Sequence, residues 1–527
     1  MSSEYKIKLR WLIIISTLIR CIFAFNIELG NDEVYYFTYA VQLDWNHFDH
    51  PPLIGLLIRF FTLNLNWINE FSMRLGAIFL AAINTWLIAK IAGYLLNERT
   101  GLIAAILYTA SLYSSIISGL FILPDSIANT FWLAALGSMI VVVKSEDRIL
   151  KDNHLILLGL WVGLGCLSKV HSIFLWLGFL SYILIFQREI LKNKELYLGL
   201  ILTAVCFLPI LFWNEEYDYI TWKFHSQRVS FLESGIRWDF FAQTSFGQIF
   251  YNNPFLIYLY IIVFISLVKN RFKIFDVPTK IIWLLLFCSL PIILVTSSLS
   301  FFRQTLPHWS GAGFFAMMLI AACWIDRKLD NDNIIRIRRL LNFQLSFVLL
   351  IMVLAFATIK WYPGNLFVKA NINEIGKGDV TLDMTGWKDL EKQFSQLRNI
   401  DIKNGKMKES DALIINNWYP AGHFYFYLSR PLQMRMIAVG RLNDIHKFAW
   451  MNLAIPEIKP KENVYFIVAS NMFQDPSLLF SDLFEEVKLH KTLEQKRSNK
   501  LVRKWYIYHL YNAKSAIGNK HPLLYME

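Results

Sequence analysis

Residues 31–53 read NDEVYYFTYAVQLDWNHFDHPPL, and they interrupt a chain whose first half is otherwise mostly apolar. They follow the first apolar run, residues 11–25, and concentrate acidic residues and histidines. The protein has 527 residues, of which 55% are hydrophobic and 17% charged, whereas soluble domains carry about 25% charged residues. Apolar runs close to the length that crosses a bilayer recur along the chain, which indicates a polytopic membrane protein.

The apolar runs predict about eleven transmembrane helices. We expect them at residues 11–25, 75–96, 102–121, 127–143, 155–167, 173–186, 196–213, 255–268, 281–299, 311–325 and 340–359. No small-residue cleavage site follows the first run, so we expect a retained helix there and not a signal peptide. One long helix through residues 168–171 is the alternative to the two short helices around them.

The basic residues indicate the orientation in the membrane. If the N-terminus is cytoplasmic, most loop lysines and arginines fall on the cytoplasmic side, as the positive-inside rule requires. The single long helix through residues 168–171 would break this pattern. The same distribution accounts for the net charge of +12 without a nucleic-acid partner. The five cysteines all lie in apolar runs and say little about the redox compartment.

The character of the sequence changes after residue 360. We expect residues 1–360 to form the transmembrane domain, with a first outer loop at 28–73, and residues 361–527 to form a soluble α/β domain. The pattern predicts a helix from residue 386 to about 399 and strands at 412–415, 434–439, 464–469 and 505–511. An odd number of spans places this domain outside the cytoplasm, on the side of the first outer loop.

The first outer loop contains the main catalytic candidates. Asp32 and Glu33 directly follow the first apolar run, and Tyr36 follows them at helical spacing. The same residues suit an ordinary helix start, because acids are favoured at the positive end of a helix and tyrosines at the membrane interface.

The second half of this loop carries Asp49 and His50, directly before two prolines. The prolines end any helix at His50, and a folded-back loop would bring Asp49 and His50 to one cavity with Asp32. Residues 51–61 then predict a short amphipathic helix on the membrane surface.

Further ionisable residues are expected on the same outer side. Asp125 follows a proline in a tight loop, where it is a catalytic candidate or a helix N-cap. Lys169 lies in a Ser-Lys turn, where it either acts on a substrate or extends to the interface. Arg20, inside the first run, has the same two interpretations. His225 and Arg228 lie in the loop 214–253, where a lone histidine is more often structural.

Carboxylates and cations beside hydrocarbon suit a reaction between a lipid-anchored phosphate and a polar acceptor. A carboxylate can take the proton of an incoming hydroxyl. Cations or a divalent metal can hold the negative charge of a leaving phosphate. No glycine-rich nucleotide loop is visible, so a nucleotide donor is not expected.

Four motifs resemble a known family: the stretch quoted above, LPDSIANTFWLAAL, GLGCLSKVHSIF and LPHWSGAGF. They resemble bacterial glycosyltransferases of the protein O-mannosyltransferase and lipid A aminoarabinose-transferase type, in the polytopic glycosyltransferase-C superfamily. The tail, with DMTGWKDL and NWYPAGHFYFYLS, resembles the periplasmic domain of the aminoarabinose-transferase branch.

The resemblance implies a sugar donor on a polyprenyl phosphate and transfer with inversion at the outer face of the bacterial inner membrane. It maps the acidic residue of the first loop onto Asp32, and it places Asp49 and His50 at the donor phosphate or a metal. It also maps a further acidic residue onto Asp125. The family variant has lysine where this chain has His50, so Lys169, a metal or a protonated His50 would supply the positive charge.

Two other functions remain open from the sequence. A lipid or glycan flippase or secondary transporter would show internal repeats and charges at the membrane midplane, and a membrane-anchored binding protein would need no polar cluster at Asp32. The sequence leaves the sugar, the acceptor and metal dependence open. Any metal is expected at Asp49, His50 and Asp125.

Overall fold

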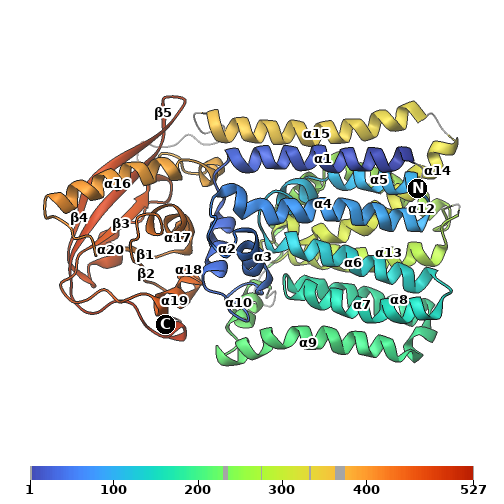
Figure 1. Cartoon of the computed structure of the whole chain (residues 1–527), viewed down its shortest axis with the longest axis horizontal. Coiled ribbons are helices and arrows are strands. Elements are labelled where there is room, and N and C mark those ends of the chain that lie inside the picture. The colour runs from blue at the N-terminus through green and yellow to red at the C-terminus, as the bar shows by residue number, and fades with distance from the viewer. Residues whose placement is uncertain (1–2, 230–234, 275, 332–333, 363–373, 526–527) are drawn as a thin grey trace. The chain divides into compact units, whose positions relative to one another are not determined.

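The computed structural model describes residues 3–229, 235–274, 276–331, 334–362 and 374–525 (Figure 1). The chain divides into two compact units. The helical unit comprises Met1–Ala24 and Asp44–Met352, and the sheet unit comprises Phe25–Leu43 and Val353–Glu527.

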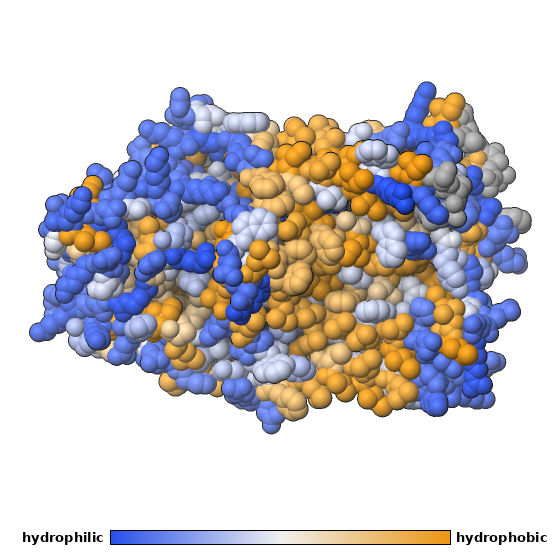
Figure 2. Space-filling view, in the orientation of Figure 1, coloured by the Kyte–Doolittle hydropathy of each residue, from blue (hydrophilic) through white to orange (hydrophobic). Residues whose placement is uncertain are grey.

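The helical unit is a bundle of mostly long, apolar helices. Its α-helices are α1 (Ser3–Asn26, in this unit to Ala24), α3 (Leu53–Phe61), α4 (Glu70–Leu95), α5 (Glu98–Thr109), α6 (Pro124–Lys144), α7 (Arg148–Cys166), α8 (Phe174–Phe186), α9 (Lys194–Glu216), α10 (Ile220–Val229), α11 (Trp238–Tyr251), α12 (Pro254–Lys269), α13 (Thr279–Leu299), α14 (Phe314–Asn331) and α15 (Ile334–Trp361, in this unit to Met352). On the face in Figure 2, apolar side chains gather over these helices, as the surface of a membrane domain requires.

Each of the eleven predicted runs contains a helix, but not all of these helices reach across a bilayer. Within the described residues, seven helices are long and apolar enough, and nine if each of two bent helix pairs counts as one span. The two remaining runs, 102–121 and 173–186, contain α5 and α8, of 12 and 13 residues. A crossing takes about 20 residues. The predicted number of eleven full spans is therefore corrected to seven to nine.

The predicted helix 102–121 ends early because side chains take the backbone partners of its last turn. The α-helix stops at Thr109, and a short π-helical turn follows at Tyr113–Ile117. The Ser115 hydroxyl donates to the Thr109 carbonyl at 2.6 Å, and the Asn253 amide donates to the Ala110 carbonyl at 2.9 Å. Such local side-chain bonds compete with helical hydrogen bonds, and hydrophobicity alone does not reveal them.

The turn between α7 and α8 agrees with the prediction of two short helices. The α-helix ends at Cys166, and a 3₁₀ turn at Val170–Ile173 leads into α8. Lys169 lies in this break, with extended backbone angles of φ −152° and ψ 117°. The predicted surface helix 51–61 is also present, as α3.

The sheet unit contains a five-stranded mixed sheet. Its strands are β1 (Ala412–Ile415), β2 (Met436–Ala438), β3 (Val464–Ala469), β4 (Phe484–Arg497) and β5 (Lys500–Ala513), in the order β2-β1-β3-β5-β4. Strand β1 pairs parallel with β2 and β3, whereas β5 pairs antiparallel with β3 and β4. Its α-helices are α2 (Asn31–Val41), α16 (Trp387–Lys403), α17 (Trp418–Phe424), α18 (Leu442–Ile445), α19 (Phe448–Met451) and α20 (Pro476–Phe480).

The sequence prediction found four of the five strands and the long helix α16. It missed β4, whose sequence FEEVKLHKTLEQKR is rich in charge. Because β4 is an edge strand, paired only with β5, most of its side chains need no apolar cover. Charged residues on an edge strand also discourage pairing with other chains.

The segment 25–43, expected within the first outer loop, folds with the C-terminal part of the chain. The His423 ring nitrogen Nε2 lies 3.0 Å from the Leu29 carbonyl, and the Leu29 amide donates to the Tyr427 hydroxyl at 2.9 Å. The Phe37 and Phe426 rings pack at 5.1 Å between centroids. These contacts make α2 a component of the sheet unit.

Candidate functional site

A buried ion pair joins Asp125 and Lys169 in the helical unit. The Lys169 ammonium lies 2.9 Å from both carboxylate oxygens of Asp125. The two side chains are only 9% and 6% exposed. Asp125 stands in the first turn of α6, where the positive helix end also favours a carboxylate. The cost of removing both charges from water is offset only by such close pairing.

Neighbouring groups fix this pair in position. The Tyr113 hydroxyl lies 2.8 Å from Asp125 Oδ1 and 3.0 Å from Asn129 Oδ1. The Ser168 hydroxyl donates to the Pro124 carbonyl at 2.7 Å, which ties the turn that carries Lys169 to the start of α6. Lys169 therefore does not extend to the membrane interface but is held against Asp125.

The loop with Asp49 and His50 lies near the same pair. Its backbone is fastened by His225, whose Nε2 lies 2.8 Å from the Asp49 carbonyl oxygen. The pKa of His50 is lowered to about 4, chiefly by desolvation and also by His225 and Lys169, while the charges of Asp49 and Asp125 oppose this shift. This lowered pKa favours a neutral His50 near pH 7; the source of positive charge among Lys169, a metal and a protonated His50 stays a prediction.

Arg20 is fully enclosed in the helical unit. Its side chain is 1% exposed, and it donates to the Ser115 carbonyl at 3.1 Å and the Ser115 hydroxyl at 3.2 Å. These bonds hold the π-helical turn after α5, so Arg20 does not extend to the surface. The side chain of Arg228, near the end of α10, is outside the part of the chain that the structure describes.

Asp32, Glu33 and Tyr36 belong to α2 in the sheet unit. Glu33 is 2% exposed, and its carboxylate accepts from the Gly30 amide at 2.8 Å, which caps the helix. Tyr36 is buried in a cluster with Tyr35 and Tyr39. Asp32 is exposed to solvent and can meet a substrate. Glu33 therefore caps α2, and a catalytic role for it stays a prediction.

Asp383 is an ionisable neighbour of Asp32 that the sequence analysis missed. Its Oδ2 accepts from the Asn31 amide at 3.1 Å, and its Oδ1 lies 3.8 Å from the His423 ring. The pKa of Asp383 is raised to about 7, chiefly by burial and also by the negative charges of Asp32 and Glu33. The sequence places Asp383 about 350 residues from α2, and no local pattern links the two.

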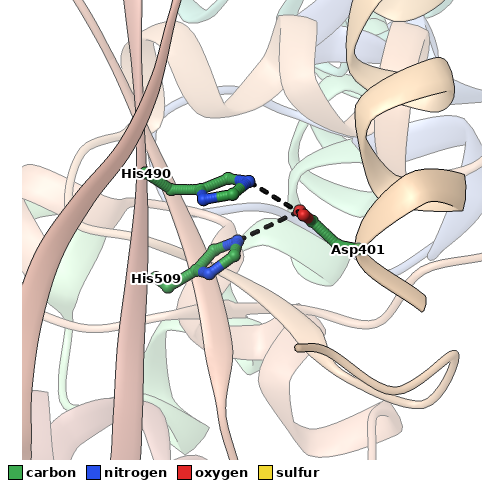
Figure 3. A group of neighbouring side chains, drawn as sticks. All are labelled: Asp401, His490 and His509. Atoms are coloured by element: carbon green, nitrogen blue, oxygen red, sulfur yellow. Dashed lines mark hydrogen bonds and ion pairs between the residues drawn. The ribbon is translucent and has the colours of Figure 1, made fainter. Parts of the chain in front are cut away.

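A group that could hold a metal ion lies in the sheet unit. Asp401, His490 and His509 bring one ligand atom each to within 4.8 Å of one another (Figure 3). The predicted metal ligands Asp49, His50 and Asp125 are not part of this group, and their binding of an ion stays a prediction. The sequence analysis missed the group because its members come from a helix and two strands.

The fold is similar to that of one protein, ArnT, in two solved structures. The chain matches ArnT from Cupriavidus metallidurans bound to undecaprenyl phosphate with a TM-score of 0.60 at 13% identity, over 96% of this chain and 98% of that one. The apo form of ArnT matches with a TM-score of 0.58 at 12% identity, over 94% and 97% of the chains. The protein is thus a polytopic helical membrane protein with a C-terminal mixed-sheet unit, as predicted, and its fold is like that of ArnT.

Sequence comparison gives two further likenesses, each to a part of the chain. Residues 49–213 match the family described as dolichyl-phosphate-mannose-protein mannosyltransferase, which confirms the predicted resemblance. Over 301 residues the chain is 24% identical to the lipid A galacturonosyltransferase RgtD of Rhizobium johnstonii. That region is 56% of this chain and 60% of the length of RgtD.

Proposed function

We propose that the protein transfers a sugar from a polyprenyl-phosphate donor to a hydroxyl group of a lipid A-like acceptor, with inversion at the anomeric carbon. The family that matches residues 49–213 is named for a polyprenyl-phosphate sugar donor, and the relative RgtD is named for a lipid A acceptor. A lipid-linked glycan or a protein hydroxyl is the alternative acceptor.

One observation carries the proposal: the ammonium of Lys169 is buried among apolar helices and forms an ion pair with the carboxylate of Asp125. A buried cation of this kind suits a phosphate that arrives on a lipid chain. In the reaction the acceptor oxygen forms a bond to the anomeric carbon while the bond to the phosphate oxygen breaks. The leaving polyprenyl phosphate keeps the electron pair, and Lys169 would stabilise the charge that develops there.

The other predicted residues take supporting roles. Asp32 is the proposed general base for the acceptor hydroxyl, since it is an exposed carboxylate and a carboxylate can take that proton in the transition state. Neutral His50 can hydrogen-bond the donor phosphate. Asp49, His50 and Asp125 stay the proposed ligands if a divalent ion takes part, and that ion would supply positive charge at the phosphate. Arg20, Tyr36, His225 and Arg228 stay proposed donor-binding or positioning residues.

The test is turnover by the purified protein in detergent with a panel of polyprenyl-phosphate sugars and lipid A. We expect transfer from one or a few donors and a product of inverted anomeric configuration. Lys169→Met should abolish it, and the exposed Lys223→Met is the matched control. Movement of lipid-linked sugar across proteoliposome membranes without transfer would favour the transporter, and donor binding without either activity would favour the binding protein.

We further propose that the protein lies in the bacterial inner membrane with residues 361–527 outside the cytoplasm. Ser410 is exposed in the sheet unit. In a variant without the five native cysteines, Ser410→Cys should react with a membrane-impermeant thiol reagent in cells with a permeabilised outer membrane. Labelling only after disruption of the inner membrane would place this part of the chain in the cytoplasm.

A further inference from the structure

Asp401, His490 and His509 come together from three elements of the sheet unit. Asp401 lies in the last turn of α16, His490 lies on β4 and His509 on β5. The Asp401 carboxylate faces both rings, with Oδ1 2.8 Å from His490 Nε2 and Oδ2 3.1 Å from His509 Nε2 (Figure 3). The two imidazoles are stacked, with centroids 3.9 Å apart and planes at 19°.

The edge strand is irregular at this point. Leu489 pairs with Tyr508 and Lys491 pairs with Ile507, so His490 is the additional residue of a β-bulge. A bulge redirects a side chain at the cost of regular pairing, and bulges are frequent beside functional sites. At this bulge, the Nε2 atoms of His490 and His509 face the same carboxylate.

Hydrogen bonding leaves part of this cluster unsatisfied. Asp401 Oδ1 and His490 Nε2 lie 2.8 Å apart as an ion pair, but their contact lacks hydrogen-bond geometry, and among the described residues neither of these buried atoms has a hydrogen bond to another group. Asp401 is 1% exposed and stands near the negative end of α16, where a further negative charge is unfavourable. A buried negative charge at this end of the helix needs a nearby positive charge. A cation between the three side chains would supply it.

Neighbouring hydroxyl groups contact the three side chains in the way that second hydrogen bonds contact metal ligands. The second ring nitrogen of His509, Nδ1, lies 3.0 Å from the Tyr511 hydroxyl. The Tyr465 hydroxyl donates to Asp401 Oδ2 at 3.2 Å. Metal-bound histidines and carboxylates are commonly oriented by such second hydrogen bonds. The side chain of His490 is 16% exposed, which leaves a route for an ion from solvent.

We propose that Asp401, His490 and His509 bind one divalent transition-metal ion of the Zn²⁺ type, with water at the open position. Two imidazole nitrogens and one carboxylate oxygen suit Zn²⁺ and its neighbours, whereas Ca²⁺ and Mg²⁺ prefer oxygen ligands alone. Bonds of about 2.0–2.1 Å in a tetrahedron place ligand atoms roughly 3.3 Å apart, and one ligand atom from each of the three residues lies within 4.8 Å of the others here. The ion would clamp the end of α16 to the β4–β5 hairpin.

The test is metal binding by the full-length protein in detergent, stripped with a chelator and titrated with Zn²⁺ alone. We expect His490→Gln and Asp401→Asn to bind one equivalent less than the wild type. The exposed His521→Ala, in the same unit, should bind as the wild type does. Tyr511→Phe, which removes an outer hydrogen bond, should weaken this equivalent by about 10–100-fold. Zn²⁺ bound elsewhere in the chain would remain in every variant.

Two further measurements keep the test decisive if a variant folds poorly. Co²⁺ in the wild-type protein should give the strong visible absorption of a tetrahedral site, and Tyr511→Phe should reduce its occupancy. Zn²⁺ should raise the unfolding midpoint of the wild type and of His521→Ala, but not that of His490→Gln. Equal Zn²⁺ stoichiometry in the wild type and His490→Gln, or no tetrahedral Co²⁺ spectrum, would overturn the proposal in favour of a hydrogen-bonded cluster without metal.

Discussion

Both units of this protein bury aspartates, but they neutralise them differently. In the helical unit Asp125 faces the permanent cation of Lys169 at 2.9 Å. In the sheet unit Asp383 contacts a backbone amide and keeps its proton up to about pH 7, while Asp401 faces two histidines. Among apolar helices with little water, a full ion pair is the stable arrangement. In the wetter sheet unit, protons or exchangeable ions can serve instead.

The first prediction concerns the proposed base. Asp32→Asn should lower kcat by about 10²–10⁴-fold, or roughly 3–5 kcal/mol of barrier, because the amide cannot accept the proton of the acceptor hydroxyl. Donor binding should change little. The control is Glu33→Gln, which should keep turnover because Glu33 caps α2. Near wild-type kcat in a folded Asp32→Asn protein would exclude Asp32 as the base.

The second prediction breaks the ion pair of the helical unit. Lys169→Met leaves Asp125 buried without its cation and should destabilise the protein by about 3–5 kcal/mol. The double variant Asp125→Asn/Lys169→Met should recover most of that stability but no turnover. The measurement is thermal unfolding in detergent together with sugar transfer.

The exposed pair Lys223–Asp218 is the matched control for this change. Lys223→Met should cost no more than about 1 kcal/mol, since solvent screens that pair. Equal losses of stability at Lys169 and Lys223 would contradict the importance of burial.

The third prediction uses the raised pKa of Asp383. Between pH 4 and pH 7 the folded protein keeps a proton that the unfolded chain releases, so folding stability should fall as the pH rises through this window. The full shift corresponds to about 4 kcal/mol at most. Asp383→Asn should flatten this dependence and raise the unfolding midpoint at pH 8 relative to the wild type.

Asp389 is a suitable control for Asp383, because it is an exposed aspartate of the same unit. Asp389→Asn should leave the pH dependence of the unfolding midpoint as it is in the wild type. An unchanged profile in Asp383→Asn would show that Asp383 is ionised throughout the window.

The smallest effect is expected at His50. Because its pKa is about 4, turnover should show no histidine step at His50 between pH 5.5 and 8. His50→Lys should keep turnover within about tenfold of the wild type, since lysine also binds phosphate, as a point charge, and any metal dependence should disappear. Loss of all transfer in a folded His50→Lys protein would show that a neutral imidazole is required.

The class of fold and most of its helices and strands could be predicted from the amino-acid sequence. The long apolar runs predicted the helices. A bilayer contains no water to hydrogen-bond the backbone, so a spanning segment must satisfy its own amides and carbonyls as a helix does. Alternating and buried apolar segments predicted β1, β2, β3 and β5. The charged strand β4 was not predicted, because an edge strand buries few apolar side chains. The motifs around Asp125 and Lys169 pointed to residues that the structure pairs; Asp125 lies at the start of α6 and Lys169 lies just after the end of α7.

The contacts between polar groups that are distant in the sequence became visible in the folded chain alone. Asp383 beside Asn31, and Asp401 between His490 and His509, are separated by hundreds or tens of residues, and no local period connects them. The early end of α5 depends on Asn253, and the role of Glu33 depends on the backbone of Gly30. The assignment of residues 25–43 to the sheet unit likewise rests on contacts with His423 and Tyr427. Hydrophobic period specifies which face of an element is buried, whereas the partners of a buried polar atom are set by the packing of the whole chain.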